Sequence, residues 1–99
     1  MIYCFDLDGT LCTNTNGRYL EAIPYLDRIK KVNELYSSGN TIIIDSARGY
    51  TTGVNWTVLT EIQLENWGLK YSNLIVGKKP YADIFIDDKA IIDEEFFKN

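Results

Sequence analysis

Four short runs of apolar, β-branched and aromatic residues predict the strands of this chain. They cover residues 1–5, 41–44, 74–76 and 81–86, and the first two contain no turn-forming residue. Runs of this length without polar alternation are typical of strands buried on both faces, as in a parallel sheet.

Two longer segments between these runs have the spacing of amphipathic helices. In residues 23–37 an apolar residue recurs at every third position from Leu26 onward, with charged residues between. Residues 56–67 show similar spacing, and a glycine suited to end a helix follows each segment. Asp93 is suited to cap a last short helical turn. Strands that alternate with helices predict an α/β fold with a parallel sheet.

The dipeptide Asn16-Gly17 lies between two short β-prone runs. Both residues tolerate the positive φ angles of tight turns, so the dipeptide predicts a hairpin. We therefore expect a small two-stranded flap beside the end of the first strand. Residues 90–92 are expected to pack as a short edge.

Ninety-nine residues suffice for one small hydrophobic core, so we expect a single domain over residues 1–99. The net charge of -4 disfavours a nucleic-acid partner, because an acidic surface gains nothing from counterion release. No apolar run is long enough to span a bilayer and no basic, apolar leader begins the chain. We therefore expect a cytoplasmic protein without a membrane partner. Cys4 and Cys12 lack metal-site spacing and are expected to be free thiols, and the absence of histidine leaves acid–base chemistry to other side chains.

Polar side chains follow three of the four predicted strands. Asp6 and Asp8 come directly after the first, Ser46 follows the second, and an acidic pair at residues 87–88 follows the fourth. Because the carboxyl ends of parallel strands share one edge of a sheet, we expect these side chains to meet there. Carboxylates this close repel each other unless a cation or a shared proton joins them. Mg²⁺ suits the place, since it binds a few carboxylates and leaves room for phosphate oxygens.

The sequence Asp-Leu-Asp-Gly-Thr at residues 6–10 resembles the first motif of the haloacid dehalogenase (HAD) superfamily of phosphatases. Ser46, the loop lysines and the pair at 87–88 follow in the order of that family's other motifs. Residues 46–50 and 77–90 are similar to small capless bacterial members, some of which are associated with capsular polysaccharide biosynthesis. The resemblance covers nearly the whole chain. It implies a Rossmann-like three-layer α/β sandwich with a short parallel sheet in the order 4-1-2-3 and no cap domain.

The resemblance also implies a role for each matching residue. Asp6 resembles the nucleophile that forms an aspartyl phosphate, and Asp8 resembles the general acid and base. Ser46 would hydrogen-bond a phosphoryl oxygen, and Lys79, which directly precedes Pro80 as in the relatives, would neutralise charge there. The implied Mg²⁺ ligands are Asp6, Asp8 through its backbone carbonyl, Asp87 and Asp88. The candidate substrate-binding residues are Gly9, Thr10, Ala47 and Arg48.

Several of these residues have simpler interpretations. Ser46 taken alone is more often the cap of a turn. Arg48 is equally suited to a plain ion pair and to gripping a second anionic group of the substrate. One of the adjacent lysines, Lys78 or Lys79, should be solvated. Asp45 adds negative charge before Ser46, but alternation along the strand points it to the other face.

The leading hypothesis is a Mg²⁺-dependent phosphatase that hydrolyses a phosphomonoester, such as a sugar phosphate. A capless site excludes water poorly and so small a domain is marginal alone, so we expect a homo-oligomer. The alternative is a non-catalytic, oligomeric module that binds metal or phosphate on a HAD-like fold. A receiver domain of a phosphorelay ranks third, because its acidic pair is adjacent, and Asp8 argues against a dehalogenase.

Overall fold

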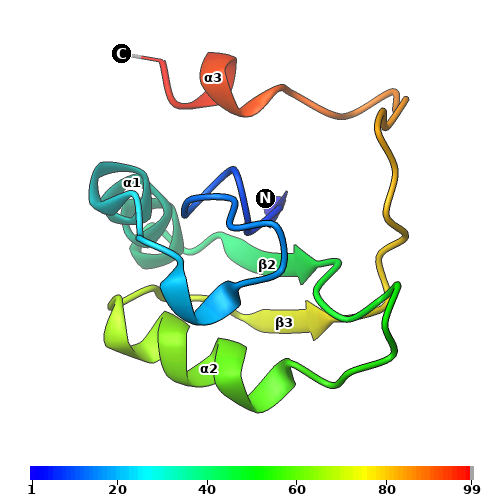
Figure 1. Ribbon diagram of the computed structural model, residues 1–99. Coiled ribbons are helices and arrows are strands. Elements are labelled where there is room, and N and C mark those ends of the chain that lie inside the picture. The colour runs from blue at the N-terminus through cyan, green and yellow to red at the C-terminus, as the bar shows by residue number, and fades with distance from the viewer. Residues whose placement is uncertain (99) are drawn as a thin grey trace.

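The computed structural model describes residues 1–98 and contains one parallel sheet in the order β1-β2-β3. Its strands are β1 (Ile2–Phe5), β2 (Thr41–Ser46) and β3 (Asn73–Val76). The helices are the 3-10 helix η1 (Tyr19–Glu21), α1 (Leu26–Ser37), α2 (Thr57–Asn66) and the short α3 (Asp93–Phe96) (Figure 1). The predicted α/β character, the first three strands and both long helices are therefore confirmed. Among the described residues, no helix is both long and apolar enough to cross a bilayer.

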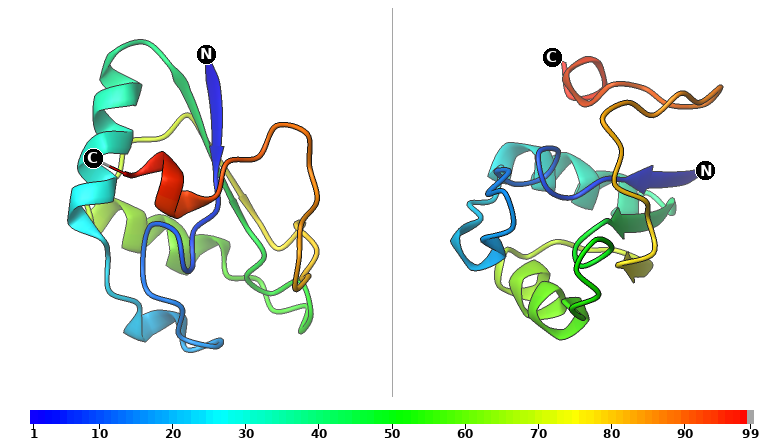
Figure 2. Two further views of the ribbon diagram at one scale, coloured as in Figure 1. Left: turned by 90° about the horizontal axis from the view of Figure 1, so that it is seen from above. Right: turned by 45° about the vertical axis from the view of Figure 1, so that its right-hand side comes forward.

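Both long helices pack on the same face of the sheet. The register pairs Tyr3 with Ile42 and Phe5 with Ile44, which places these four side chains on one face. Ile29 and Val32 of α1 and Leu64 of α2 complete the buried core there. Right-handed βαβ connections that step in the same direction place their helices on one face. The part of the chain that the structure describes thus forms two layers rather than the expected three-layer sandwich, as Figure 2 (left) shows.

Residues 81–92, here called the arm, are exposed and form no strand. In Figure 1 the arm runs from the end of β3 past the end of β2 and then turns back toward α3. The expected fourth strand at 81–86 is missing for a topological reason. Only residues 77–80 separate β3 from it, whereas a crossover to another parallel strand takes about a dozen residues or more. The short edge expected at 90–92 is also not formed.

Helix α3 fastens the far end of the arm to the core. The ring of Phe96 lies 5.9 Å from that of Tyr3 and 5.5 Å from that of Phe5. Arg28 of α1 forms an ion pair with Asp93 at 2.6 Å. The arm is therefore held at both ends, and its exposed middle contacts the rest of the molecule through Phe85, whose ring centroid lies 4.8 Å from Lys79 Nζ.

The expected flap is present as a turn without strands. Asn16 and Gly17 have φ angles of 54° and 96°, as the dipeptide predicts. The pairing ends at a single bridge between Cys12 and Pro24, and the chain then forms η1 instead of a second strand. Two backbone hydrogen bonds flank the bridge, from Thr13 N–H to Ile23 O and from Tyr25 N–H to Leu11 O, both at 2.9 Å.

Candidate functional site

The end of β1 presents two carboxylates on either side of a buried leucine. Leu7 is completely buried, whereas Asp6 and Asp8 are each half-buried. Gly9 has a φ of +88°, and the backbone N–H of Leu11 donates to Leu7 O at 2.8 Å. This tight turn holds both carboxylates at the carboxyl edge of the sheet, where the sequence predicts them.

Lys79 and Thr10 hold the carboxylate of Asp6. Lys79 Nζ lies 3.3 Å from Asp6 Oδ1, and Thr10 Oγ1 donates to Asp6 Oδ2 at 3.2 Å. The neighbouring Lys78 is exposed, so the structure brings Lys79 rather than Lys78 to Asp6. The side chain of Asp6 remains 40% exposed, which leaves its carboxylate open to an approaching ligand.

Asp8 forms a two-pronged ion pair with Arg48. Arg48 Nε donates to Asp8 Oδ2 and Arg48 Nη2 to Asp8 Oδ1, both at 2.8 Å. Such a fork of two charge-assisted hydrogen bonds fixes the orientation of a carboxylate. Asp8 is thereby held in one rotamer, with its side chain 17% exposed.

The remaining donors of Arg48 point into the protein. Arg48 Nη1 donates to Thr60 Oγ1 at 3.1 Å and to Gln63 Oε1 at 2.6 Å, and the Arg48 side chain is fully buried. The expectation that Arg48 grips the substrate is therefore wrong for this structure. Four of its five N–H donors are taken by Asp8 and α2, which agrees with the ion-pair alternative.

Thr60 and Gln63 were missed in the sequence. They lie three residues apart on the buried face of α2, so two polar residues on an otherwise apolar helix face were the available signal. Gln63 also donates through Nε2 to Tyr19 O at 2.5 Å, and the Tyr19 ring lies 4.6 Å from Arg48 Cζ. Helix α2 and η1 together therefore support the residue that orients Asp8.

Ser46 lies on the floor of the site. The register pairs Phe5 with Ile44. Leu7 lies two residues beyond Phe5, and Ser46 lies two residues beyond Ile44. Ser46 therefore lies level with Leu7, between Asp6 and Asp8. Its Oγ accepts the backbone N–H of Arg48 at 3.2 Å, which is the turn-capping role. Among the described residues its own O–H has no acceptor, but Ser46 is only 1% exposed, so a ligand must reach a buried hydroxyl to accept from it. Asp45 faces the opposite side of the sheet with Cys4 and Ile43, as alternation predicts.

Two of the candidate substrate-binding residues have other uses here. The backbone N–H groups of Gly9 and Thr10 donate to Cys12 O and Leu7 O, at 2.8 and 3.1 Å. They stabilise the turn and are not free for an anion. Ala47 is half-buried beside Ser46 and carries no polar side-chain atom.

Cys12 packs beneath Asp8. Its Sγ lies 3.5 Å from Asp8 Oδ1, and the side chain is completely buried. Burial, with the negative charge of Asp8 as a second cause, raises the pKa of the Cys12 thiol from 9.0 to about 12. Cys12 is therefore a protonated packing residue rather than a nucleophile.

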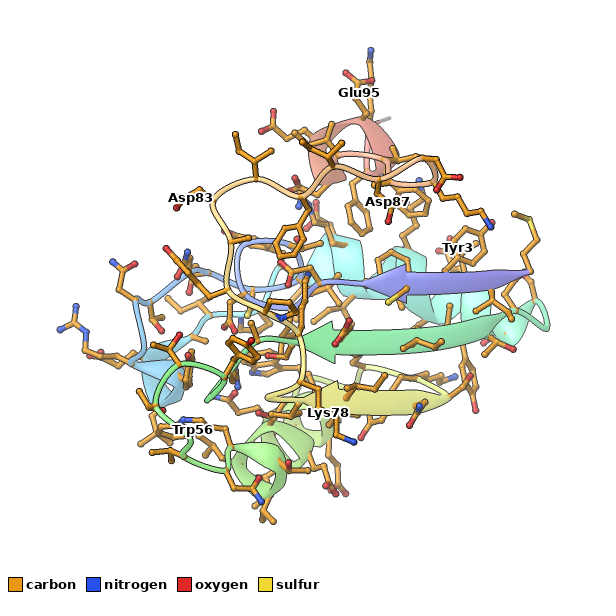
Figure 3. All side chains as sticks on the ribbon, turned by 90° about the vertical axis from the view of Figure 1, so that its right-hand side faces the viewer. Tyr3, Trp56, Lys78, Asp83, Asp87 and Glu95 are labelled. Atoms are coloured by element: carbon orange, nitrogen blue, oxygen red, sulfur yellow. The ribbon has the colours of Figure 1, made fainter. Side chains whose placement is uncertain are left out.

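Asp87 and Asp88 do not reach the site in the single chain. Both lie on the exposed arm, whose position relative to the sheet Figure 3 shows through the labelled Asp83 and Asp87. The backbone N–H of Lys89 donates to Asp87 Oδ1 at 2.9 Å and lowers the pKa of that carboxyl below its ordinary value. The structure thus brings Asp6, Asp8, Ser46 and Lys79 together and leaves the acidic pair outside.

The residues of one chain do not complete the expected Mg²⁺ site. Asp6 and the backbone carbonyl of Asp8 are suitable oxygen ligands. Across residues 1–98, however, no three acidic, cysteine or histidine side chains lie close enough together to hold a metal. The other two expected ligands, Asp87 and Asp88, lie on the exposed arm.

The fold is similar to that of a solved protein. The crystal structure of a structural-genomics target from Vibrio cholerae is 28% identical, with a TM-score of 0.87 over 99% of this chain and 88% of that chain. The alignment spans nearly all of the chain and so includes the arm. Neither a family model nor a curated protein matches the sequence.

Proposed function

We propose that the chain is a phosphatase of the HAD type, which hydrolyses a phosphomonoester through an aspartyl phosphate on Asp6. One observation carries the proposal: Lys79 lies 3.3 Å from the partly exposed carboxylate of Asp6, beside an Asp8 whose orientation is fixed by Arg48. A half-exposed carboxylate next to a cation is suited to meet a phosphoryl group without strong repulsion.

In the first step an Asp6 oxygen attacks phosphorus in line. The bond between phosphorus and the leaving oxygen breaks, and that oxygen takes a proton from Asp8, which has to enter this step protonated although it pairs with Arg48. In the second step Asp8 takes a proton from water, the water oxygen attacks phosphorus, and the bond between Asp6 and phosphorus breaks. Lys79 counters the charge on the phosphoryl oxygens throughout, and Ser46 is placed to donate to one of them.

A hollow near the site reaches it through Tyr19, whose ring contacts Arg48, the partner of Asp8, and it is a candidate place for the leaving group. It has a volume of about 270 Å³ and is lined by Gly17, Arg18, Tyr19, Leu20, Glu21 and Trp56. The rings of Tyr19 and Trp56 meet edge to face with centroids 5.0 Å apart. Such rings pack well against the apolar face of a sugar, so a sugar phosphate fits this proposal.

The decisive experiment measures phosphate release from a generic aryl phosphate and from a panel of sugar phosphates, with Mg²⁺ and with a chelator. The wild type, Asp6→Asn and the surface control Asp27→Asn are compared. We expect turnover that needs Mg²⁺, persists in Asp27→Asn and falls roughly 10³-fold or more in Asp6→Asn.

A non-catalytic module that binds phosphate or metal is the second candidate. The incomplete set of carboxylates in the single chain favours it. Calorimetry measures whether the wild type binds inorganic phosphate or Mg²⁺. Binding without phosphate release from any substrate would favour the non-catalytic module over the phosphatase.

A further inference from the structure

Within residues 1–98, the outer edge of β1 has no partner strand. The sheet order is β1-β2-β3, so β1 pairs on one side only. Ile2 is 71% exposed and Cys4 is also exposed on this edge. An open strand edge is a template for pairing with another extended segment.

The arm has the composition of a strand but is left in water. Ile84, Phe85 and Ile86 are 77%, 54% and 97% exposed. β-branched and aromatic residues are enriched in strands, and three consecutive apolar residues are seldom left exposed in a monomer. The molecule thus presents an unpaired strand edge and an unpaired strand-like segment at once.

The arm cannot fill the edge of its own sheet in the parallel direction. It starts at the carboxyl edge, where Lys79 contacts Asp6, and a parallel strand beside β1 would have to start at the opposite edge. The three steps from Pro80 to Asp83 span at most about 11 Å, less than the roughly 13 Å length of β1 that the chain would first have to retrace. The arm of another molecule is free of this restriction.

We propose that the chain forms an exchanged dimer in which the arm of each copy adds a parallel strand to the β1 edge of the other. The register that puts Asp87 beside Asp6 rests on the function proposed above. It sets Phe85 beside Cys4, and it turns Ile84 and Ile86 to the face that carries Tyr3 and Phe5. Asp87 and Asp88 of the second copy then join Asp6 and Asp8, and each site needs both copies.

The position of α3 agrees with this arrangement. Arg28 donates to Thr10 O at 2.9 Å and pairs with Asp93, so α3 begins beside the turn that carries Asp6 and Asp8. A strand that ends with Asp87 beside Asp6 leaves residues 88–92 to reach Asp93. Five extended residues span about 17 Å, which lets the chain pass from the end of the added strand to the start of α3 at the same edge of the sheet. Helix α3 therefore travels with the arm and makes the same contacts on the other copy, as exchanged elements do.

The exchange of arms also explains why the expected metal site is incomplete in one chain. In one chain the acidic set stops at Asp6 and Asp8, and the exchanged arm supplies the carboxylates that are missing. In this dimer the sheet has the strand order 4-1-2-3, and strand 4 is the arm of the second molecule. The motifs keep their order along each sequence.

A cross-linking experiment tests the interface without any assay of activity. Phe85→Cys is introduced with the natural Cys4 in place, and the protein is oxidised and separated under non-reducing denaturing conditions. Adjacent strands lie about 4.8 Å apart, which lies within the Cα separation of disulfides, so we expect a covalent dimer. Cys4→Ser combined with Phe85→Cys is the matched control and should stay monomeric. Because residue 85 is exposed on the arm, neither change threatens the core.

Light scattering after size exclusion of the unmodified protein should give the mass of two chains. A monomer at high concentration would overturn the exchanged dimer. So would a disulfide that joins Cys4 to the introduced cysteine of the Phe85→Cys variant within one chain.

Complementation tests the composite site. Asp6→Asn and the double variant Asp87→Asn/Asp88→Asn are each expected to be inactive, and they are unfolded together and refolded as a mixture. Random pairing makes half of the dimers mixed, and each mixed dimer holds one intact site of two, so about one quarter of wild-type activity should return. No recovery with an active wild type would overturn the composite site. An inactive wild type that still cross-links would reject the phosphatase and keep the dimer.

Discussion

Arg48 decides the geometry of the site although it does not meet the substrate. Its guanidinium joins Asp8 on β1 to Thr60 and Gln63 on α2, and it is fully buried. A buried cation is stable only when its donors find partners, and here four of the five N–H groups of Arg48 donate to side-chain oxygens. Asp8 therefore keeps its orientation because a helix far along the chain holds its partner.

Replacing Arg48 by lysine should uncouple these elements. Lysine keeps the charge but loses the fork, and it leaves the side-chain oxygens of Thr60 and Gln63 without their donor. We expect Arg48→Lys to lower the free energy of unfolding in urea by about 3 kcal/mol. The control is Arg18→Lys, whose exposed pair with Glu21 should contribute almost nothing. Equal effects of the two changes would contradict the role given to Arg48.

The raised pKa of Cys12 predicts that the protein loses stability at alkaline pH. The unfolded thiol has a pKa near 9, whereas burial raises the pKa of Cys12 to about 12 in the folded protein. Between these pH values the unfolded chain releases a proton that the folded chain keeps, so the free energy of unfolding falls as pH rises. The loss approaches 1.4 kcal/mol for each pH unit, by the usual conversion of about 1.4 kcal/mol per pKa unit.

Urea titrations at pH 8, 9 and 10 measure this effect. Burial also raises the pKa values of Tyr19 and Tyr71, which act in the same direction at higher pH. Cys12→Ala should therefore keep part of the decline but show a shallower slope than the wild type. Parallel slopes for the two proteins would reject the assignment to Cys12.

At the scale of the element, the loop between β2 and α2 depends on a glycine. Gly49 has a φ of +85°, and a Cβ at this position would overlap the carbonyl oxygen of Val54. The loop must close this tightly because Arg48 turns inward to α2 while the chain leaves the sheet. Side chains other than glycine are excluded by both the backbone angle and the contact.

Gly49→Ala should cost about 3 kcal/mol of unfolding free energy, and Gly39→Ala only about 1 kcal/mol. Gly39 has a similar φ of +93°, but no atom lies within 4 Å of its Cβ position, so this pair separates backbone strain from overlap. Urea denaturation of both variants measures the difference. Similar costs for the two would show that the loop opens to accept the methyl group.

The whole molecule contains one conflict between sequence preference and topology. The arm prefers to be a strand, the edge of β1 is open, and the short connection keeps the two apart within one chain. In the exchanged dimer the arm pairs with the β1 edge of the second copy, so the conflict is removed. The site then forms only at protein concentrations at which the chain dimerises.

Limited proteolysis should reveal that dependence. Chymotrypsin is expected to cut at Tyr81 or Phe85 on the arm, and cutting should slow by roughly tenfold or more when the protein concentration is raised through the dimerisation range. Tryptic cutting at the exposed Arg18 serves as the control and should not change. A rate of arm cleavage independent of concentration would contradict a covered arm.

Local sequence determined the strands β1 to β3, the two long helices and the delivery of Asp6 and Asp8 to the carboxyl edge of the sheet. Each depends on a short apolar run or a helical period, which are properties of neighbouring residues. The turn at Asn16-Gly17 was also predictable, although the residues expected as its second strand form η1 instead.

Only the tertiary structure decided what surrounds those carboxylates and where the arm goes. The burial of Arg48 between Asp8, Thr60 and Gln63 joins residues that are up to 55 positions apart, from 8 to 63, so no local pattern announces it. The arm has the sequence of a strand, but the reach of residues 77–80 keeps it from the parallel position beside β1. Periodicity records which residues avoid water, whereas the length of a connection determines which edge they can reach.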